Sequence, residues 1–480
     1  MQSTQAPPPA ALLVAVQFPD VSDEDHRGSL DELERLASTL GYRCVGRLSQ
    51  RRASSRGATV LGEGALKTLA GWTGGAGVVK SRAFRKKTKA ALKNEAPEGD
   101  ESEEMEEADE PDGGISAGVP PVEKAEVVIF DCELTPSQLR NLESATGATV
   151  LDRTGVVIGI FNRHAKTREA KIQVELASLA YLSPRLRETG GQDRQGGGIG
   201  AKGAGETSLE LDRRKIRDRM KELRAELEAV RGEQATRRSR RSNETTVALV
   251  GYTNAGKSSL MRALTGSEVL VADQLFATLD TTVRPMKPET RPRLLISDTV
   301  GFIKQLPHDL VASFRSTLDE AAGAALQLLL VDAADPAFRA QLAVVQTVLE
   351  EVGAGGIPRI LVLNKRDLLS PIDLALLQRE FPGAIAICTR DAGDLALLRD
   401  KITEFFARNF LERELFAPYG AAGFIGEVHG QFKVLSENYE EAGVRFRVQG
   451  TEAMFEWFRR KFSEMGMEEK APPEGEPPAL

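Results

Sequence analysis

The feature that most constrains the fold is a glycine-rich segment between a short apolar strand and a helix. The strand TTVALV runs into Gly251-Tyr-Thr-Asn-Ala-Gly256-Lys257-Ser258, and a helical pattern follows from Ser259. This segment matches G-x-x-x-x-G-K-[ST], a loop whose backbone N–H groups cradle phosphates beside a helix N-terminus. The lysine reaches the terminal phosphate oxygens, and the serine hydroxyl binds Mg²⁺. Because the strand–loop–helix context is also right, we favour a nucleotide-binding α/β domain over an incidental glycine-rich turn.

Two further motifs stand at the ends of later apolar strands. LLISD ends in Asp298-Thr-Val-Gly301, where the acid can hold the water shell of a metal and the glycine N–H can meet a γ-phosphate. ILVLN ends in Asn364-Lys365-Arg366-Asp367, 66 residues after Asp298. The Asp367 carboxylate can accept two hydrogen bonds from groups that guanine presents and adenine does not. The order and spacing of the three motifs predict a guanine-nucleotide switch rather than an adenylate kinase or a helicase.

Two positions of this switch stay open on the residues alone. The stretch LFATLDTTVR at 275–284 offers Thr278, Thr281 and Thr282 as the second hydroxyl ligand of Mg²⁺, and chemistry does not choose among them. Phe302 follows the DxxG motif, where small GTPases carry a nearby glutamine that orients the attacking water. A phenylalanine cannot orient water, so we expect slow intrinsic hydrolysis until another group does so. Phe302 can equally be a core residue at a strand end, and both interpretations are compatible.

Strand and helix patterns alternate through the first third of the chain. Apolar runs at 11–18 and 125–132 predict buried strands, and Thr135-Pro136 predicts the start of a helix. We expect one N-terminal α/β domain at 10–165. Within it, residues 73–124 run first basic and then acidic with almost no apolar periodicity, which predicts a disordered insertion.

A helical hairpin is predicted for residues 166–243. A helical pattern at 167–187 and a glycine-rich loop at 196–206 precede a second helix. The apolar residues of this second helix recur at spacings of four and three, a heptad pattern that we interpret as packing between two helices: Ile216, Met220, Leu223, Leu227 and Val230.

The remaining chain predicts two more domains and a tail. Near-continuous apolar strands separated by helices at 244–408 are typical of a parallel sheet covered on both faces. A helix-and-strand pattern at 409–467, which ends in a helix at 452–462, predicts a small α+β domain. The Pro- and Glu-rich tail 468–480 is expected to be disordered.

The net charge of −7 hides a basic strip. Eleven acidic residues and no basic residue lie between Glu95 and Asp112, so the rest of the chain carries +4. The segment 213–241 holds twelve Lys and Arg against five acids. Such a strip is typical of a nucleic-acid contact surface, although a solvated helix face gives the same pattern.

Membrane and disulfide classes are disfavoured by the sequence. No apolar run in the 480 residues approaches the roughly 20 needed to span a bilayer, and the start MQSTQAPPPA lacks the basic residues of a secretion signal. Three widely spaced cysteines make neither a disulfide framework nor a zinc site. We therefore expect a protein of the reducing cytoplasm without a transmembrane segment.

Several segments resemble the HflX family of ribosome-associated GTPases. They are GAGETSLELDRR (203–214), GYTNAGKSS (251–259), LFATLD (275–280), DTVGFIKQLPHDLVASFRSTLDE (298–320), LTPSQLRNLE (134–143) and VLDRTGVVIGIF (150–161). The resemblance covers nearly all of 10–465 except the insertion. It implies an α/β multidomain fold, which comprises an N-terminal α/β domain with a long helical hairpin, a Ras-like P-loop GTPase domain with a mostly parallel sheet, and a small C-terminal α+β domain.

The same resemblance implies a function. GTP would be hydrolysed with Mg²⁺ as cofactor, slowly alone and faster on ribosomes, and the protein would bind the large ribosomal subunit and its ribosomal RNA to split or rescue stalled or idle ribosomes. The hairpin loop 196–206 would lie against ribosomal RNA. The free protein would be monomeric and cytoplasmic, with a part of it peripheral to the membrane. The alternative is a GTP-regulated protein-binding module in stress signalling without direct ribosome action.

Site residues follow by carrying the family motifs onto matching positions. Thr278 becomes the switch I ligand of Mg²⁺ beside Ser258, and the expected catalytic residues are Lys257, Thr278, Asp298 and Gly301. Cys388-Thr389-Arg390 stands where the family has Ser-Ala-Lys, which predicts weaker guanine affinity. The expected GTP-binding set is Gly251, Tyr252, Thr253, Asn254, Ala255, Gly256, Lys257, Ser258, Phe276, Ala277, Thr278, Leu279, Asp280, Asp298, Thr299, Val300, Gly301, Asn364, Lys365, Arg366, Asp367, Cys388, Thr389 and Arg390. The expected RNA contacts are Lys202, Arg213, Arg214 and Arg217.

Overall fold

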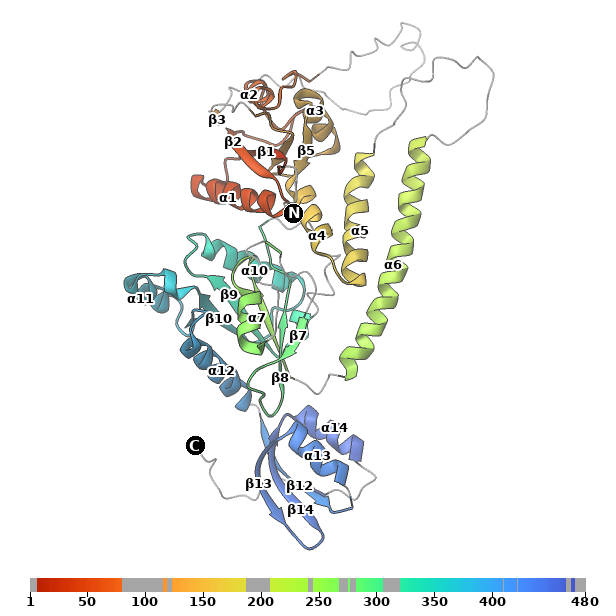
Figure 1. Cartoon of the computed structure of the whole chain (residues 1–480), viewed down its shortest axis with the longest axis vertical. Helices are drawn as coiled ribbons and strands as arrows, with labels where there is room; N and C mark the ends of the chain where they lie inside the picture. The colour runs from red at the N-terminus through yellow and green to blue at the C-terminus, as the bar shows by residue number, and fades with distance from the viewer. Residues whose placement is uncertain are drawn as a thin grey trace, which may run out of the picture. The chain divides into compact units, whose positions relative to one another are not determined.

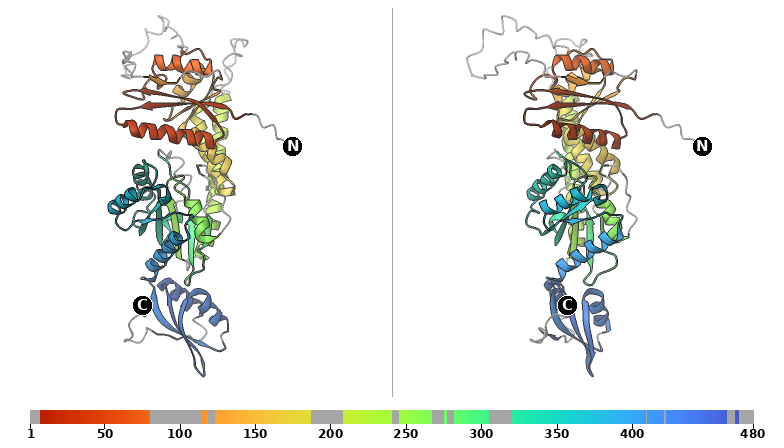
Figure 2. Two further views of the ribbon diagram at one scale, coloured as in Figure 1. Left: turned by 60° about the vertical axis from the view of Figure 1, so that its left-hand side comes forward. Right: turned by 90° about the vertical axis from the view of Figure 1, so that its left-hand side faces the viewer.

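Three sheets organise the part of the chain that the structure, a computed structural model, describes (Figures 1 and 2). The described residues are 7–79, 115–118, 123–186, 208–240, 245–266, 275–276, 282–304, 320–408, 410–420, 422–462 and 468–470. The chain divides into two compact units: residues 1–163 with 180–209, and residues 164–179 with 210–480.

The first unit is built on a five-stranded sheet with strand order β3-β2-β1-β4-β5. Its strands are β1 (Ala10–Gln17), β2 (Arg43–Arg51), β3 (Ile115–Ala117), β4 (Val127–Phe130) and β5 (Thr149–Asp152), and only the pair β2–β3 is antiparallel. Its helices are α1 (Asp23–Thr39), α2 (Glu63–Thr73), α3 (Pro136–Thr146) and α4 (Arg153–His164). β1 is buried along its whole length because helices cover both faces of the sheet (Figure 1). The predicted α/β class is confirmed.

The predicted insertion 73–124 is wrong at both ends. At its N-terminal end, Thr73 is the last residue of α2, and the Gly77 N–H donates to the Ala145 carbonyl at 3.0 Å. Ile115–Ala117 forms β3, which pairs antiparallel with Leu48–Gln50 of β2. A three-residue edge strand carries too little apolar pattern to be recognised in a charged segment. Residues 80–114 lie outside the described residues.

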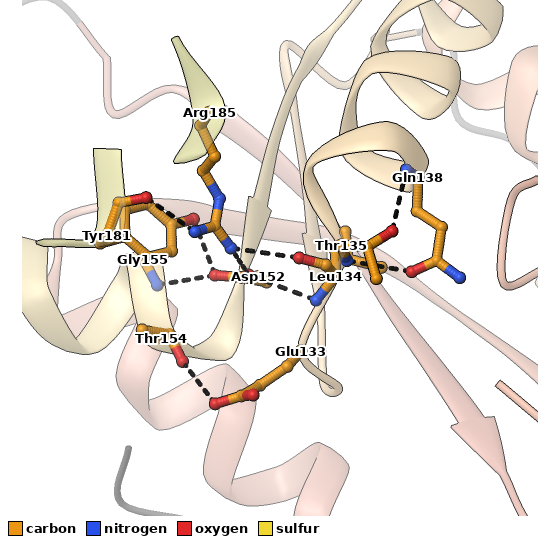
Figure 3. Close-up of polar contacts among 9 residues, drawn as sticks. All are labelled: Glu133, Leu134, Thr135, Gln138, Asp152, Thr154, Gly155, Tyr181 and Arg185. Carbon is orange, nitrogen blue, oxygen red and sulfur yellow. Dashed lines mark hydrogen bonds and ion pairs between the residues drawn. The ribbon is translucent and has the colours of Figure 1, made fainter. Parts of the chain in front are cut away.

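A buried carboxylate ties the end of the sheet to the elements around it (Figure 3). The Asp152 side chain is fully buried at the end of β5 and accepts four hydrogen bonds. Its Oδ1 accepts from the Gly155 N–H and the Tyr181 hydroxyl, both at 2.8 Å, and its Oδ2 accepts from the Leu134 N–H at 3.3 Å and from Arg185 at 2.9 Å. Burial beside this carboxylate raises the pKa of the Tyr181 phenol. The cluster therefore fixes the segment around Arg185 onto the sheet.

A second buried ion cluster lies at the start of α4. Arg153 is 2 % exposed and donates to Glu32 of α1 and, at 2.7 Å, to Asp131 after β4. Removing one partner of a buried ion cluster leaves uncompensated charge in a medium that solvates it poorly. The guanidinium thus pairs with two carboxylates at once.

We expect Arg153→Ala to destabilise this unit by about 3–5 kcal/mol, because Glu32 and Asp131 would remain buried without their cation. The local free energy of opening can be measured by hydrogen–deuterium exchange of the β1 and β4 amides. Arg47→Ala is the matched control, since Arg47 is 41 % exposed where it pairs with acids of α1, and its loss should cost less than about 1 kcal/mol. Equal effects of the two substitutions would contradict the prediction.

The helical hairpin predicted for 166–243 has most of its two helices in the second unit, whereas residues 180–209 belong to the first. Its helices are α5 (Arg168–Leu182) and α6 (Ser208–Arg240), which lie side by side (Figure 1). Ile172 and Leu176 of α5 pack on Leu223 and Leu227 of α6, so the heptad pattern is indeed packing. The first helix ends before its predicted limit, because Pro184 has no N–H to continue the helix and lies in the 3₁₀ turn η2 (Ser183–Arg185). The loop 196–206 lies outside the described residues.

A six-stranded sheet forms the core of residues 245–408, with strand order β11-β10-β9-β6-β8-β7. Five strands are parallel: β6 (Thr245–Gly251), β8 (Leu294–Asp298), β9 (Leu326–Asp332), β10 (Arg359–Asn364) and β11 (Ile385–Ala386). β7 (Thr282–Pro285) is an antiparallel edge. The helical elements are α7 (Lys257–Thr265), α10 (Phe338–Glu351), η3 (Arg366–Leu368), α11 (Pro371–Glu380) and α12 (Ala392–Ala407).

The C-terminal residues form a small α+β domain, as predicted. Its antiparallel sheet has the order β13-β14-β12-β15 and comprises β12 (Leu411–Pro418), β13 (Lys433–Tyr439), β14 (Gly443–Gly450) and β15 (Glu468–Lys470). Phenylalanines of α13 (Ala422–Gln431) and α14 (Glu452–Phe462) pack on its inner face. The predicted disordered tail 468–480 is wrong for Glu468–Lys470, which pairs with β12. No helix in the described parts of the chain is long and apolar enough to cross a membrane.

Candidate nucleotide-binding site

The phosphate-binding loop is shaped by its glycines. β6 ends at Gly251, α7 begins at Lys257, and the residues between them turn through left-handed backbone at Asn254 (φ 62°) and Gly256 (φ 95°). A Cβ on Gly256 would lie 2.1 Å from the Asn364 side-chain nitrogen, so only glycine fits there. The loop therefore arrives at the N-terminus of α7, where the first amides of the helix can bind an anion.

Lys257 closes over this loop. Its side chain is 7 % exposed, and Nζ donates to the carbonyl oxygens of Gly251 at 3.1 Å and Tyr252 at 2.8 Å. Burial lowers the pKa of Lys257 to about 8, and the nearby Asp298 carboxylate opposes that shift. The cation is thus held by main-chain carbonyls at the place where phosphate oxygens would enter.

Ser258 and Asp298 meet at the mouth of the same loop. The Ser258 hydroxyl donates to Asp298 Oδ2 at 2.9 Å, and Asp298 is fully buried at the end of β8 opposite Leu249 of β6. Hydroxyl and carboxylate oxygens are the hard donors that Mg²⁺ prefers, so the residues present fit the implied cofactor. Thr278 and Thr281 lie outside the described residues, as does the rest of 277–281. The assignment of Thr278 as the switch I ligand of Mg²⁺ therefore stays a prediction. Phe276 is described, and its side chain is buried.

The DxxG turn lies directly against the phosphate-binding loop. The Thr299 hydroxyl donates to the Leu249 carbonyl at 2.7 Å, and the Thr253 N–H donates to the Phe302 carbonyl at 2.8 Å. A Cβ on Gly301 would lie 2.8 Å from the Thr253 methyl group and 3.1 Å from Lys257 Nζ. The sequence placed these motifs 40 residues apart, and the structure brings them into contact.

Phe302 is a core residue. Its side chain is 2 % exposed, and its backbone bridges to Tyr252 in parallel register. The interpretation of Phe302 as core is confirmed. Slow intrinsic hydrolysis stays a prediction.

The Asn364-Lys365-Arg366-Asp367 motif is attached to the phosphate-binding loop as well. The Asn364 amide donates to the Ala255 carbonyl at 2.8 Å, and Lys365 Nζ lies 2.6 Å from Asp332 Oδ2. Lys365 adopts left-handed backbone (φ 61°), which turns the chain into η3 and leaves the Asp367 carboxylate exposed. The expected base reader is therefore presented to solvent on a segment that is fixed at its start.

Arg366 forms ion pairs with the segment that begins α12. Its guanidinium pairs with Asp394 and, at 3.2 Å, with Asp391 of the turn that begins α12. Asp394 also accepts the Cys388 N–H at 2.7 Å. The first amide of the Cys388-Thr389-Arg390 segment is thus already used within the protein.

Sequence reasoning missed three side chains that shape this site, and it missed the contact made by a fourth. Asp332, Asp391 and Asp394 hold the base end in place, and Tyr252 was assigned only as a member of its motif. One signal was available for Asp332, since it ends an apolar strand directly before the strand of Asn364 in the chain. The other contacts join segments that are distant in the sequence, and no sequence pattern predicts that they meet.

The predicted RNA contacts lie on exposed faces of α6, where they are described. Arg213, Arg214 and Arg217 are exposed, and Lys202 lies outside the described residues. Four cations share one side of the helix, next to the buried seam, and form no ion pair with other residues that the structure describes; we call them the cationic stripe: Arg213, Arg217, Lys221 and Arg224.

Other basic residues of the hairpin are paired. Arg219 Nε lies 2.8 Å from Glu175, and Arg168 pairs with Glu226 at 2.8 Å, so both ion pairs cross between the helices. Lys215 and Arg231 pair with acids three residues away on α6. The basic strip is therefore divided into a paired side and the cationic stripe.

Comparison with known proteins matches three family models in order. Residues 117–162 match GTP-binding GTPase N-terminal, residues 164–241 match GTP-binding GTPase Middle Region, and residues 246–365 match 50S ribosome-binding GTPase. GTPase HflX of Gluconacetobacter diazotrophicus is 53 % identical over 462 residues, 96 % of this chain and 99 % of the relative. GTPase HflX of Caldanaerobacter subterraneus is 36 % identical, with 92 % and 91 % covered. A GTP-binding protein from Sulfolobus solfataricus, solved in complex with GDP, is 22 % identical, with 82 % and 98 % covered and a TM-score of 0.40.

Proposed function

Because the chain belongs to the HflX family of GTPases, we propose that its GTP hydrolysis acts on the large ribosomal subunit and splits or rescues stalled or idle ribosomes. The GTPase activity itself follows from the family. The contact of three motifs supports the location of the GTP site. Within the loop 251–258, Lys257 donates to Gly251, Ser258 donates to Asp298 of the DxxG motif, and Ala255 accepts from Asn364.

At the phosphate end, the geometry supports positioning and charge neutralisation. Lys257 would exchange the carbonyls of Gly251 and Tyr252 for β- and γ-phosphate oxygens, and the loop amides would hold the β-phosphate. The Gly301 N–H would meet the γ-phosphate, since no side chain separates it from Lys257. Such preorganised donors act where charge develops during phosphoryl transfer.

Ser258 would bind Mg²⁺ directly, with Asp298 on its water shell and Thr278 as the switch I ligand. When bound, Mg²⁺ neutralises charge on the β- and γ-phosphate oxygens. The existing contact between Ser258 and Asp298 orients both oxygens toward one place.

Two observations support ribosomal RNA as the partner. The model matched by residues 246–365 is that of a 50S ribosome-binding GTPase. The cationic stripe also presents four charges along more than two turns of α6, a spacing suited to successive phosphates. A GTP-regulated protein-binding module would need no such stripe.

The decisive test is GTP turnover with and without purified large subunits at several salt concentrations. We expect stimulation by large subunits, and the stimulation should weaken steeply as salt rises because phosphate contacts release counterions. Turnover that large subunits leave unchanged would favour the protein-binding alternative.

A double variant tests the cationic stripe. Arg213→Ala with Arg217→Ala should weaken binding to large subunits and lower the slope of log affinity against log salt by about two, one for each lost phosphate contact. The matched control is Lys215→Ala with Arg231→Ala, which removes the same charge from residues that are paired on α6. Equal salt slopes for the two double variants would remove the stripe from the interface.

A further inference from the structure

The chain returns to the phosphate-binding loop immediately after the DxxG turn. Phe302 bridges to Tyr252, and its N–H donates to the Gly251 carbonyl at 3.2 Å. Two residues later, the Lys304 N–H donates to the Tyr252 hydroxyl at 2.5 Å. A side chain of the phosphate-binding loop thus holds the main chain of the segment that follows Gly301.

With this contact, the DxxG turn is hydrogen-bonded to the neighbouring segments on both sides. On one side, Asp298 is held in register with Leu249, and Thr299 donates to the Leu249 carbonyl. On the other side, the Phe302 main chain is bonded to Gly251 and Thr253, and the Lys304 N–H is bonded to the Tyr252 hydroxyl. The orientation of the Gly301 N–H, which lies between these anchors, is therefore set by both.

The Tyr252 ring does not need a hydroxyl to fill its place. Its side chain is buried, and phenylalanine would occupy the same volume. The donor is a main-chain N–H, which every residue except proline supplies at position 304. Tyr252→Phe therefore removes the acceptor of the Lys304 N–H and keeps the aromatic ring in place.

We propose that Tyr252 is a positioning residue for GTP hydrolysis, whose hydroxyl holds the chain after the DxxG turn so that Gly301 faces the γ-phosphate. This assignment rests on the proposed contact between Gly301 and the γ-phosphate. Because GDP has no γ-phosphate, loss of this hydrogen bond should lower GTP affinity and kcat and should leave GDP affinity unchanged. A residue that only supported the loop would affect both nucleotides equally.

The experiment uses the full-length Tyr252→Phe variant. We expect GDP affinity to stay within about twofold of the unmodified protein, while affinity for a non-hydrolysable GTP analogue and kcat each fall about three- to tenfold, as for one lost neutral hydrogen bond. Tyr439→Phe is the matched control, because it removes an exposed phenol of β13 that bonds to Glu437, and it should change neither quantity.

A second variant removes the donor instead of the acceptor. Lys304→Pro should reproduce the selective loss, and the double variant should be no worse than either single change because all three lack the same bond. GDP affinity reports whether each variant has folded.

Two results would overturn the inference. They are an unchanged ratio of GTP-analogue to GDP affinity with unchanged kcat in Tyr252→Phe, and equal losses for both nucleotides. A separate variant, Gly301→Ala, distinguishes the proposed function from the inference. If Gly301→Ala lowers GTP-analogue affinity no more than it lowers GDP affinity, the proposed contact between Gly301 and the γ-phosphate is wrong, independently of the result for Tyr252.

Discussion

Lys257→Ala is expected to abolish GTP turnover and to weaken nucleotide binding severely. The ammonium is buried over the loop, and two loop carbonyls hold it beside the place where phosphate oxygens would replace them. Removing one preorganised donor typically costs 10²–10³-fold in kcat, and Lys257 would serve two phosphate groups, so we expect a loss of at least about 10³-fold.

Single-turnover hydrolysis and nucleotide titration measure this effect separately. Lys433→Ala, on exposed β13, is the control for loss of a lysine elsewhere and should behave as the unmodified protein. Unchanged turnover by Lys257→Ala in a clean preparation would show that hydrolysis takes place at another site.

Asp367→Asn should exchange the preference for guanosine nucleotides for xanthosine nucleotides. The exposed carboxylate can only accept hydrogen bonds, as guanine requires, whereas an amide can donate to the additional carbonyl of xanthine. Because an unpaired polar group is costly in a base pocket, we expect GTP affinity to fall about 10²-fold or more while XTP affinity rises.

Competition titration with GTP and XTP measures the exchange. Asp373→Asn is the matched control, since Asp373 is an exposed acid that interacts with Ser370 at the start of α11. If Asp367→Asn binds GTP undiminished, another group reads the base.

The sequence predicts the elements of this protein best where burial alone determines them. β1, β6, β8 and β9 are continuous apolar strands in parallel sheets, and their pattern needs no partner to be recognised. α4 was missed because RTGVVIGIF is rich in β-branched residues, which favour strands in isolation. Its apolar side chains become buried as a helix in the first unit, so tertiary packing decides the outcome.

Short edge strands escaped for a different reason. β3 and β15 have three residues each, and their identity comes from the backbone groups of β2 and β12 that they pair with. Single-sequence patterns contain no information about which edge is left unpaired.

The candidate site shows the same division. Motif spacing predicts Lys257, Ser258 and Asp298 as neighbours, because their chemistry requires it. The contact of Asn364 with Ala255 and the pairing of Arg366 with Asp394 depend on how two loops meet in space, and these segments are unrelated in sequence. The hydroxyl of Tyr252 carries no sequence signal, because a tyrosine or a phenylalanine can occupy a buried aromatic position and the pattern does not show which partner a hydroxyl would find.

The carboxylate of Asp152 limits how this chain can change over evolutionary time. Both of its oxygens face donors only, two N–H or O–H groups each (Figure 3). Asparagine has nearly the same shape, yet its amide nitrogen would point hydrogens at two groups that also carry hydrogens. A glutamate would place its carboxylate one methylene further out, in a position that is already fully enclosed. The substitutions that position 152 accepts are therefore limited by the four donors around it. Replacing Asp152 without loss of stability requires Tyr181 or Arg185 to change as well.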